Sequence, residues 1–291
     1  MKTLFIYFQY IVPQHALSRF AGLIANCEWP WLKNTIIKAF IKHYDVNMSE
    51  AVDPIPESYG SFNQFFTRAL KDDARPVAAG ENKIVCPADG AVSQLGAIKN
   101  GRIFQAKGQD YSLLELLGGD QETASSFANG QFTTIYLSPK DYHRVHMPLT
   151  GKLISMTYVP GDLFSVNTST AENVPRLFSR NERAVCIFDT NAGPMAIVLV
   201  GAMIVAGIET VWDGQIAPLK REIKVSHYNK EPRTIVIEKG GEMGRFKLGS
   251  TAIVLFGPKV MEWNENLSAG SPTQMGSLLG EAISEQNLDN I

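Results

Sequence analysis

The sequence is short of the residues that cross-link small proteins or bind zinc. It has only three cysteines, Cys27, Cys86 and Cys186, an odd number without a C-x-x-C spacing. This argues against a disulfide framework or a cysteine zinc site, and it is compatible with a reducing compartment. Charge of one sign is also scarce. The formal net charge is −2, so no basic field indicates nucleic acid as a partner.

Long apolar runs are lacking as well. The opening LFIYFQYIVP is interrupted at Gln9 and stopped at Pro13, and it is too short to span a bilayer. It makes a poor signal peptide, because only Lys2 precedes it and no A-x-A site follows cleanly. The chain has 291 residues, of which 45% are hydrophobic and 19% charged, as in a globular protein with one large domain or two smaller ones.

Two amphipathic helices are predicted before residue 45. HALSRFAGLIANC places Leu17, Phe20 and Ile24 on one helix face, and PWLKNTIIKAFIKHY carries a similar apolar stripe after Pro30. The basic residues of positions 1–43, set against the single acid Glu28, are Lys2, Arg19, Lys33, Lys38 and Lys42. Such helices, with tryptophans at their ends, suit a membrane interface. Packing on the protein's own domain explains the pattern equally well.

From about residue 82 the pattern becomes that of strands. After a short helix predicted from Ser61, capped with Gln64, brief β-branched runs alternate with Gly, Pro, Asn and Asp. Only DYSLLELLGG interrupts these runs with a helical pattern. The predicted fold class is therefore α+β, with a helical region at residues 1–75 and a mainly antiparallel, β-rich catalytic domain at residues 76–291.

Few side chains in the β-rich part can do chemistry. His143 and His146 stand together in SPKDYHRVHMP, between two prolines that favour a loop or a short strand end. An H-x-x-H pair can bind metal, but neither an H-E-x-x-H helix nor a third ligand accompanies it, so no metal site is predicted. Asp89 precedes Gly90 in CPADGAV, where the chemistry of a hairpin turn would explain both residues.

The segment FKLGSTAIVLF places a glycine and Ser250 at the entrance of an apolar strand. Glycine weakens a strand and marks a close approach. With Asp89 as acid and His146 as base, Ser250 could be an activated nucleophile, yet no G-x-S-x-G elbow surrounds it. A serine hydroxyl that directly follows Gly249 can instead attack the preceding carbonyl and form an ester. Elimination and hydrolysis then leave a pyruvoyl group at position 250.

These segments resemble those of bacterial phosphatidylserine decarboxylases. FKLGST, PADG, YHRVHMP, VPGDLFSVN, RNER and VGAMIVAGI occur in the family's order, within a match from SFNQFFTR to FGPKV. The resemblance implies cleavage between Gly249 and Ser250, with Ser250 becoming a covalent pyruvoyl cofactor. It implies that His146 and Asp89 support self-cleavage and that His143 serves decarboxylation. The pyruvoyl group would replace pyridoxal phosphate as electron sink while phosphatidylserine becomes phosphatidylethanolamine.

The resemblance also implies a location and partners. The protein would lie peripherally on the cytoplasmic face of the cell membrane, with its N-terminal helices on the bilayer. Its large and small chains would remain associated, and a homodimer is compatible with the family. Two other classes stay open on the residues alone. A serine hydrolase would use Asp89, His146 and Ser250 on an external ester and remain one chain, and a β-rich binding module would need none of them.

Overall fold

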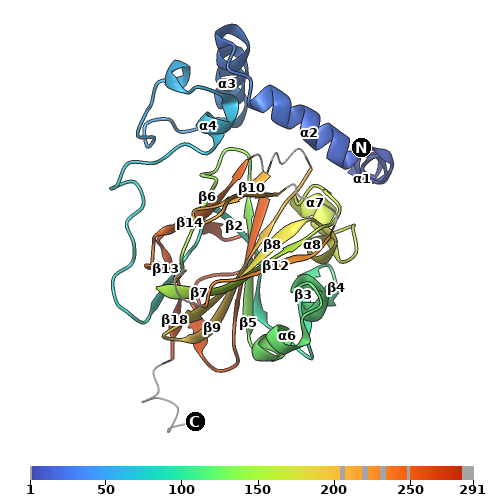
Figure 1. Ribbon diagram of the computed structural model, residues 1–291, viewed down its shortest axis with the longest axis vertical. Helices are drawn as coiled ribbons and strands as arrows, with labels where there is room; N and C mark the ends of the chain where they lie inside the picture. The colour runs from blue at the N-terminus through green and yellow to red at the C-terminus, as the bar shows by residue number, and fades with distance from the viewer. Residues whose placement is uncertain (1, 204–206, 218–221, 230–233, 248–249, 284–291) are drawn as a thin grey trace.

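The computed structural model describes residues 2–203, 207–217, 222–229, 234–247 and 250–283 (Figure 1). An N-terminal helical layer lies over one end of a β-rich body, which confirms the predicted α+β class. The helices are α1 (Lys2–Ile11), α2 (Gln14–Ala25), α3 (Pro30–Tyr44), η1 (Pro56–Ser58), α4 (Phe62–Phe66), α5 (Leu113–Leu116), α6 (Gln121–Phe127), α7 (Thr168–Ala171) and α8 (Leu177–Arg180).

The body is built on a nine-stranded antiparallel sheet. Its strand order is β12-β7-β8-β9-β15-β5-β2-β17, and β13 also pairs with β7. Its strands are β2 (Gly90–Ala97), β5 (Gln131–Leu137), β7 (Gly151–Val159), β8 (Arg183–Thr190), β9 (Gly193–Val200), β12 (Lys224–His227), β13 (Val236–Ile237), β15 (Ser250–Phe256) and β17 (Pro272–Thr273).

Three smaller antiparallel sheets complete the body. One of them has the order β11-β10-β14-β6, and it matters for the site because β6 and β14 adjoin the histidines and Ser250. The strands of the smaller sheets are β1 (Lys83–Val85), β3 (Arg102–Ala106), β4 (Gln109–Ser112), β6 (Arg144–His146), β10 (Gly207–Thr210), β11 (Gly214–Ala217), β14 (Glu242–Lys247), β16 (Met261–Trp263) and β18 (Leu278–Ala282).

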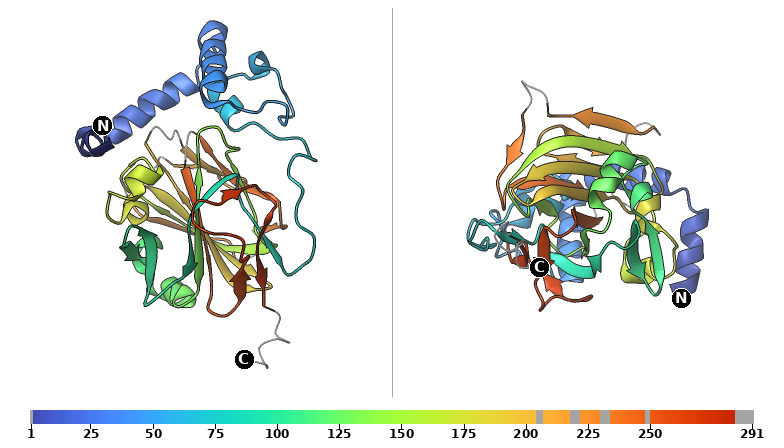
Figure 2. Two further views of the ribbon diagram at one scale, coloured as in Figure 1. Left: turned by 180° about the vertical axis from the view of Figure 1, so that it is seen from behind. Right: turned by 90° about the horizontal axis from the view of Figure 1, so that it is seen from below.

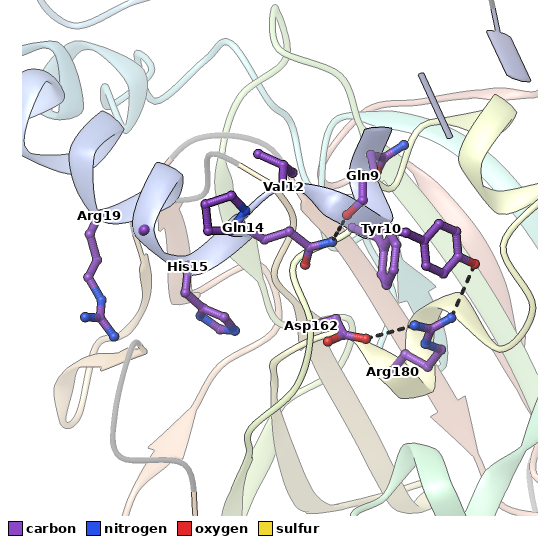
Figure 3. Close-up of a pocket in the computed structure, with 11 residues that line it drawn as sticks. Gln9, Tyr10, Val12, Gln14, His15, Arg19, Asp162 and Arg180 are labelled. Carbon is purple, nitrogen blue, oxygen red and sulfur yellow. Dashed lines mark hydrogen bonds and ion pairs between the residues drawn. The ribbon is translucent and has the colours of Figure 1, made fainter. Parts of the chain in front are cut away.

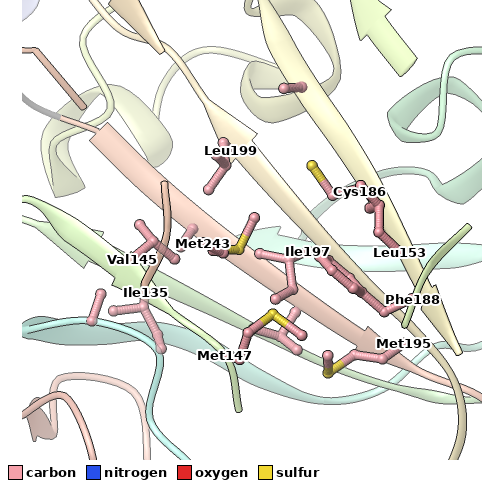
Figure 4. Close-up of a cluster of buried hydrophobic side chains, with 14 of the residues drawn as sticks. Ile135, Val145, Met147, Leu153, Cys186, Phe188, Met195, Ile197, Leu199 and Met243 are labelled. Carbon is pink, nitrogen blue, oxygen red and sulfur yellow. The ribbon is translucent and has the colours of Figure 1, made fainter. Parts of the chain in front are cut away.

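The central strand β15 is covered on both faces. Ala252 and Val254 belong to one apolar cluster, part of which is shown in Figure 4, whereas Ile253 and Leu255 belong to a second cluster on the opposite face. Alternate side chains of a strand point to opposite faces, so burial on both sides requires an unbroken apolar run. The AIVLF sequence after Ser250 therefore reflects this central position.

Short helices cover the second face of the sheet near the β3–β4 hairpin (Figure 2). The prediction of a single helical interruption was wrong, because α6, α7 and α8 are also present. These helices span only four to seven residues, too few for an apolar repeat to be recognised. The helix predicted from Ser61 is confirmed as α4, whose Gln64 N–H donates to Ser61 Oγ at 3.3 Å.

The two predicted amphipathic helices differ in what they bury. The apolar stripe of α3 packs inside the protein, where Ile37 joins Phe62, Phe65 and Phe66 in a small separate core. The helix α2 does the reverse. Leu23 is 73% exposed, and small residues such as Gly22 face inward. The structural interpretation therefore holds for α3, while the apolar face of α2 remains open.

The basic edge expected on α3 is not free. Lys33 is buried, and its ammonium donates to the carbonyl oxygens of Glu57 at 2.9 Å and Tyr59 at 2.6 Å. Lys38 forms an ion pair with Glu57. Lys33 therefore stabilises the loop that precedes α4, and its predicted place on a solvent-exposed or membrane-facing edge was wrong.

Candidate active site

The predicted residues gather at one end of the main sheet because of its strand order. β5 lies between β2 and β15 and runs antiparallel to both, with Leu137 opposite Ser250 and Tyr136 opposite Ala91. The starts of β2 and β15 therefore flank the end of β5. Asp89 and Ser250 therefore lie at the same end of the sheet, on either side of β5, and the chain that leaves β5 leads directly to the histidines of the β6 segment.

The sequence predicted a hairpin turn at the Asp89–Gly90 step, but the structure has none there. The strands β1 and β2 on either side of it belong to different sheets. Gly90 has φ 151°, and a Cβ there would lie 2.2 Å from the carbonyl oxygen of Tyr136. Only glycine fits, because backbone from β5 occupies the space of a side chain.

Asp89 is held by an arginine that precedes the β-rich body. Arg75 donates through Nε at 3.0 Å to both carboxylate oxygens and through Nη2 at 2.6 Å to Oδ2. The Met275 N–H adds a bond of 2.8 Å, and Glu50 accepts from the same Nη2 at 2.9 Å. Burial opposes the charge of Arg75, but the bonds to Asp89 and Glu50 outweigh it and raise the pKa of the guanidinium.

His146 is oriented by a carbonyl, not by Asp89 as the sequence had led us to expect. Its Nδ1 lies 2.8 Å from the carbonyl oxygen of Gly240, which can only accept, so Nδ1 carries the proton. Nε2 is then the basic nitrogen, and the Tyr142 hydroxyl lies 3.1 Å from it. Burial lowers the pKa of His146, while the Gly240 bond and the charges of Glu242 and Asp89 oppose this shift.

His143 is completely buried beside the helical layer. Its ring stacks on Phe66 of α4 with centroids 4.0 Å apart, and its Nδ1 donates to the Asp141 carbonyl at 2.8 Å. Burial lowers the pKa of His143 to about 3, so the ring is neutral and Nε2 keeps a lone pair. Nε2 has no hydrogen-bond partner among the described residues.

Ser250 begins β15 with its side chain buried. Its Oγ also lacks a hydrogen-bond partner within the described chain. Gly249, the other residue of the predicted cleavage site, lies outside the described residues. The hydrogen bond from the Phe246 N–H to the His143 carbonyl, 3.0 Å long, joins the strand before Ser250 to the histidine segment. A buried polar atom without a partner calls for an explanation, and a reactive role is one explanation for these two.

Sequence reasoning missed three groups that complete the site: Arg75, Tyr142 and the Gly240 carbonyl. Tyr142 stands within YHRVHMP, so a search for partners of His146 could have included it. Arg75 and Gly240 carry no local signal, since their contacts with the site span 14 and 94 residues of sequence. The described residues contain no group of three or more His, Cys, Asp or Glu that could hold a metal ion.

Comparison with known proteins gives a consistent result. The family model described as phosphatidylserine decarboxylase matches residues 62–281, and a second model, PSD, matches residues 4–45. A phosphatidylserine decarboxylase proenzyme of Pseudomonas putida (strain W619) is 63% identical over 97% of this chain and 99% of its own. The proenzyme of Ectopseudomonas mendocina (strain ymp) is 61% identical over the same shares of the two chains.

Proposed function

Because the chain belongs to the phosphatidylserine decarboxylase family, we propose that it converts phosphatidylserine to phosphatidylethanolamine with a pyruvoyl group made from Ser250. The observation that carries this proposal is the hydroxyl of Ser250, which is buried at the entrance of β15 and unpaired among the described residues. A buried serine hydroxyl without a partner calls for an explanation. An unpaired one suits a nucleophile whose partner is the peptide bond before it.

The self-processing reaction needs only the chain and water. Ser250 Oγ attacks the carbonyl carbon of Gly249, the peptide C–N bond breaks, and the freed nitrogen takes a proton, which leaves an ester. Loss of the Ser250 α-proton then breaks the Cβ–O bond and releases residues 1–249 as a carboxylate. Water hydrolyses the remaining dehydroalanine, ammonia leaves, and the small chain begins with a pyruvoyl group.

His146 is the base that we assign to this reaction. The Gly240 carbonyl fixes the proton on Nδ1, so Nε2, which lies 3.1 Å from the Tyr142 hydroxyl, is the nitrogen that would accept the proton of the serine. Its lowered pKa keeps the ring neutral and therefore basic near neutral pH. Asp89 contributes through Arg75 and the Met275 amide, which fix the start of β2, and through its charge near the imidazole.

The site fits a pyruvoyl group because Ser250, whose carbon atoms would form it, is buried at the start of β15. When formed, that group supplies the electron sink for loss of CO2. We assign His143 the proton transfers of turnover. Its Nε2, which has no hydrogen-bond partner among the described residues, would take up and return a proton during turnover.

The purified protein is expected to separate into two polypeptides under denaturing conditions. Intact mass should identify residues 1–249 and residues 250–291, the second with an N-terminal pyruvoyl group in place of serine. The same sample should release CO2 from phosphatidylserine. A single uncleaved chain with esterase activity would contradict the proposal and favour a serine hydrolase.

We also propose that the protein acts as a peripheral protein on the cytoplasmic face of the cell membrane, held there by residues 1–75. No described helix is long and apolar enough to cross a bilayer. Instead α1 and α2 expose large apolar side chains and bury polar ones, the reverse of a helix on the surface of a soluble protein. Ile11 is 84% exposed and Leu23 73%, whereas Gln9 and Ser18 are buried. A large apolar face outside and polar residues inside favour contact with lipid.

Replacing Phe20 and Leu23 of α2 by serine is expected to weaken binding to liposomes by at least about tenfold, because each exposed apolar side chain contributes about 1.5–3 kcal/mol when it is buried. Binding should be measured by flotation with neutral and with anionic vesicles. Added salt should change binding little, since the Lys33 ammonium is hydrogen-bonded inside the protein and Lys38 pairs with Glu57 at the surface.

The matched control is Val225→Ser, which removes an exposed apolar side chain from the edge strand β12 and should leave flotation unchanged. Turnover of a short-chain, water-soluble phosphatidylserine should be equal in all variants. Unaltered flotation of the double variant on neutral vesicles would rule out α2 as the membrane-binding face.

A further inference from the structure

The interruption of the apolar helix α1 by Gln9 has a structural cause. Gln9 is completely buried, although most of its large apolar neighbours are exposed. Its Oε1 accepts from the Ser165 N–H at 2.8 Å, and its Nε2 donates to Thr170 Oγ1 at 3.3 Å. A buried side-chain amide is tolerated only when it is hydrogen-bonded, so Gln9 helps to fix the direction and depth of α1.

The first turn of α2 contacts the same part of the body. Gln14 accepts from the Leu163 N–H at 2.6 Å and donates to the Gln9 carbonyl at 2.7 Å (Figure 3). His15 Nε2 lies 3.0 Å from the Gly161 carbonyl oxygen, to which it donates. The corner between α1 and α2 is therefore fastened by directional bonds to residues 161–165, which we call the 161–165 loop.

This loop has few backbone partners of its own, since Leu163, Phe164 and Ser165 lie outside every described helix and strand. Their N–H groups donate to side-chain amides instead, to Gln14, Asn181 and Gln9 respectively. Two of these three acceptors belong to the membrane-facing helices. Because Leu163 and Phe164 are buried, water cannot easily replace a lost acceptor.

The 161–165 loop also borders the reactive end of the sheet. Asn181 Nδ2 donates at 2.8 Å to the carbonyls of both Phe164 and Gly201. Gly201 follows Val200, which pairs with Thr251, the neighbour of Ser250. A Cβ on Gly201 would lie 3.5 Å from the Leu163 side chain, so the loop packs beside the entrance of β15.

A cavity of about 500 Å³ adjoins this corner. Two of its charged groups pair, since Arg180 donates to Asp162 at 3.0 Å (Figure 3), and Arg180 also lies over the rings of Tyr10 and Phe164. These contacts add to the attachment of α1 and do not define a ligand. The role of the α1–α2 corner is therefore to hold the 161–165 loop.

We propose that Gln9 and Gln14 are positioning residues for the decarboxylation, because they hold the 161–165 loop in place as a wall beside position 250. This inference rests on the function proposed above. In this view α1 and α2 both attach the protein to the membrane and support the reactive site. A displacement of about 1 Å near reacting atoms costs on the order of 100-fold in rate, so loosening this loop should slow turnover.

The test compares Gln14→Met with Gln14→Glu in the full-length protein. Methionine keeps the length of the side chain but removes the acceptor, whereas glutamate keeps an oxygen for the Leu163 N–H. Turnover of a short-chain, water-soluble phosphatidylserine is measured per mole of small chain. We expect kcat to fall about tenfold or more in Gln14→Met, with KM within about twofold, and to fall less in Gln14→Glu, which loses only the bond to the Gln9 carbonyl.

Gln109→Met is the matched control. Gln109 lies on β4, and its replacement removes a side-chain hydrogen bond of 3.3 Å to the Glu172 carbonyl, which should leave kcat unchanged. The Gln9→Met, Gln14→Met double variant should lose more activity than either single change. If the double variant does not fold, the comparison between the two Gln14 variants decides. Parent-like kcat in Gln14→Met, or equal losses in Gln14→Met and Gln14→Glu, would overturn the inference. Absence of a small chain in the parent would instead refute the proposed function.

Discussion

Replacing Ser250 by alanine is expected to leave the protein as one uncleaved chain without decarboxylase activity. The variant lacks the oxygen that attacks Gly249, and no other hydroxyl of β15 directly follows that carbonyl. The effect should be complete within detection, because both cleavage and the prosthetic group depend on one atom. Electrophoresis and intact mass after prolonged incubation measure it.

Folding should survive this change. Ser250 Oγ forms no hydrogen bond with the described residues, so alanine leaves no partner unsatisfied. Thr251→Val is the matched control, since Thr251 is also buried, its Oγ1 has no partner among the described residues, and valine has the same shape. It should mature like the parent. Appearance of residues 250–291 from the Ser250→Ala protein would refute serine attack as the cleavage mechanism.

The two histidines should differ in the step that they support. His146→Ala is expected to slow self-cleavage by on the order of 10²–10⁴-fold, the usual contribution of a general base. His143→Ala should still yield two chains but turn over poorly per mole of small chain, because its unpaired Nε2 is assigned to turnover. Timed electrophoresis measures the rate of self-cleavage, and CO2 release normalised to the small chain measures turnover.

Asp89→Asn is expected to block or strongly slow self-cleavage as well, through the loss of the charged partner of Arg75. A control is Asp110→Asn, which breaks an exposed ion pair with Arg102 and should mature normally. If His143→Ala abolishes cleavage while His146→Ala matures like the parent, the two histidine roles must be exchanged.

The pH dependence of self-cleavage gives an independent check on His146. The neutral ring is the base, and burial lowers its pKa below the ordinary value of 6.5. The rate should therefore stay constant as pH falls through 6.5 and decline only at lower pH, where the ring becomes protonated. A decline centred above 6.5 would point to a base with a raised pKa.

Much of this protein could be predicted from local sequence. The helices α2, α3 and α4, the change to antiparallel strands and the unusual Gly249–Ser250–Thr251 step are encoded within a few neighbouring residues each. Periodicity and caps determine such features locally, so they can be recognised without the fold. The candidate residues Asp89, His143, His146 and Ser250 were also found in this way, since each stands in a distinctive short motif.

Tertiary structure decided what those residues touch. The β2-β5-β15 order brings Asp89 and Ser250 to one end of the sheet. The sequence predicted that Asp89 would orient His146, but Asp89 binds Arg75 and His146 binds the Gly240 carbonyl. It also decided which helix faces are open: the stripe of α3 became a core, that of α2 stayed exposed, and Gln9 turned inward to the 161–165 loop. Sequence patterns report the chemistry of a face, but only packing against distant segments determines whether it meets protein, water or lipid.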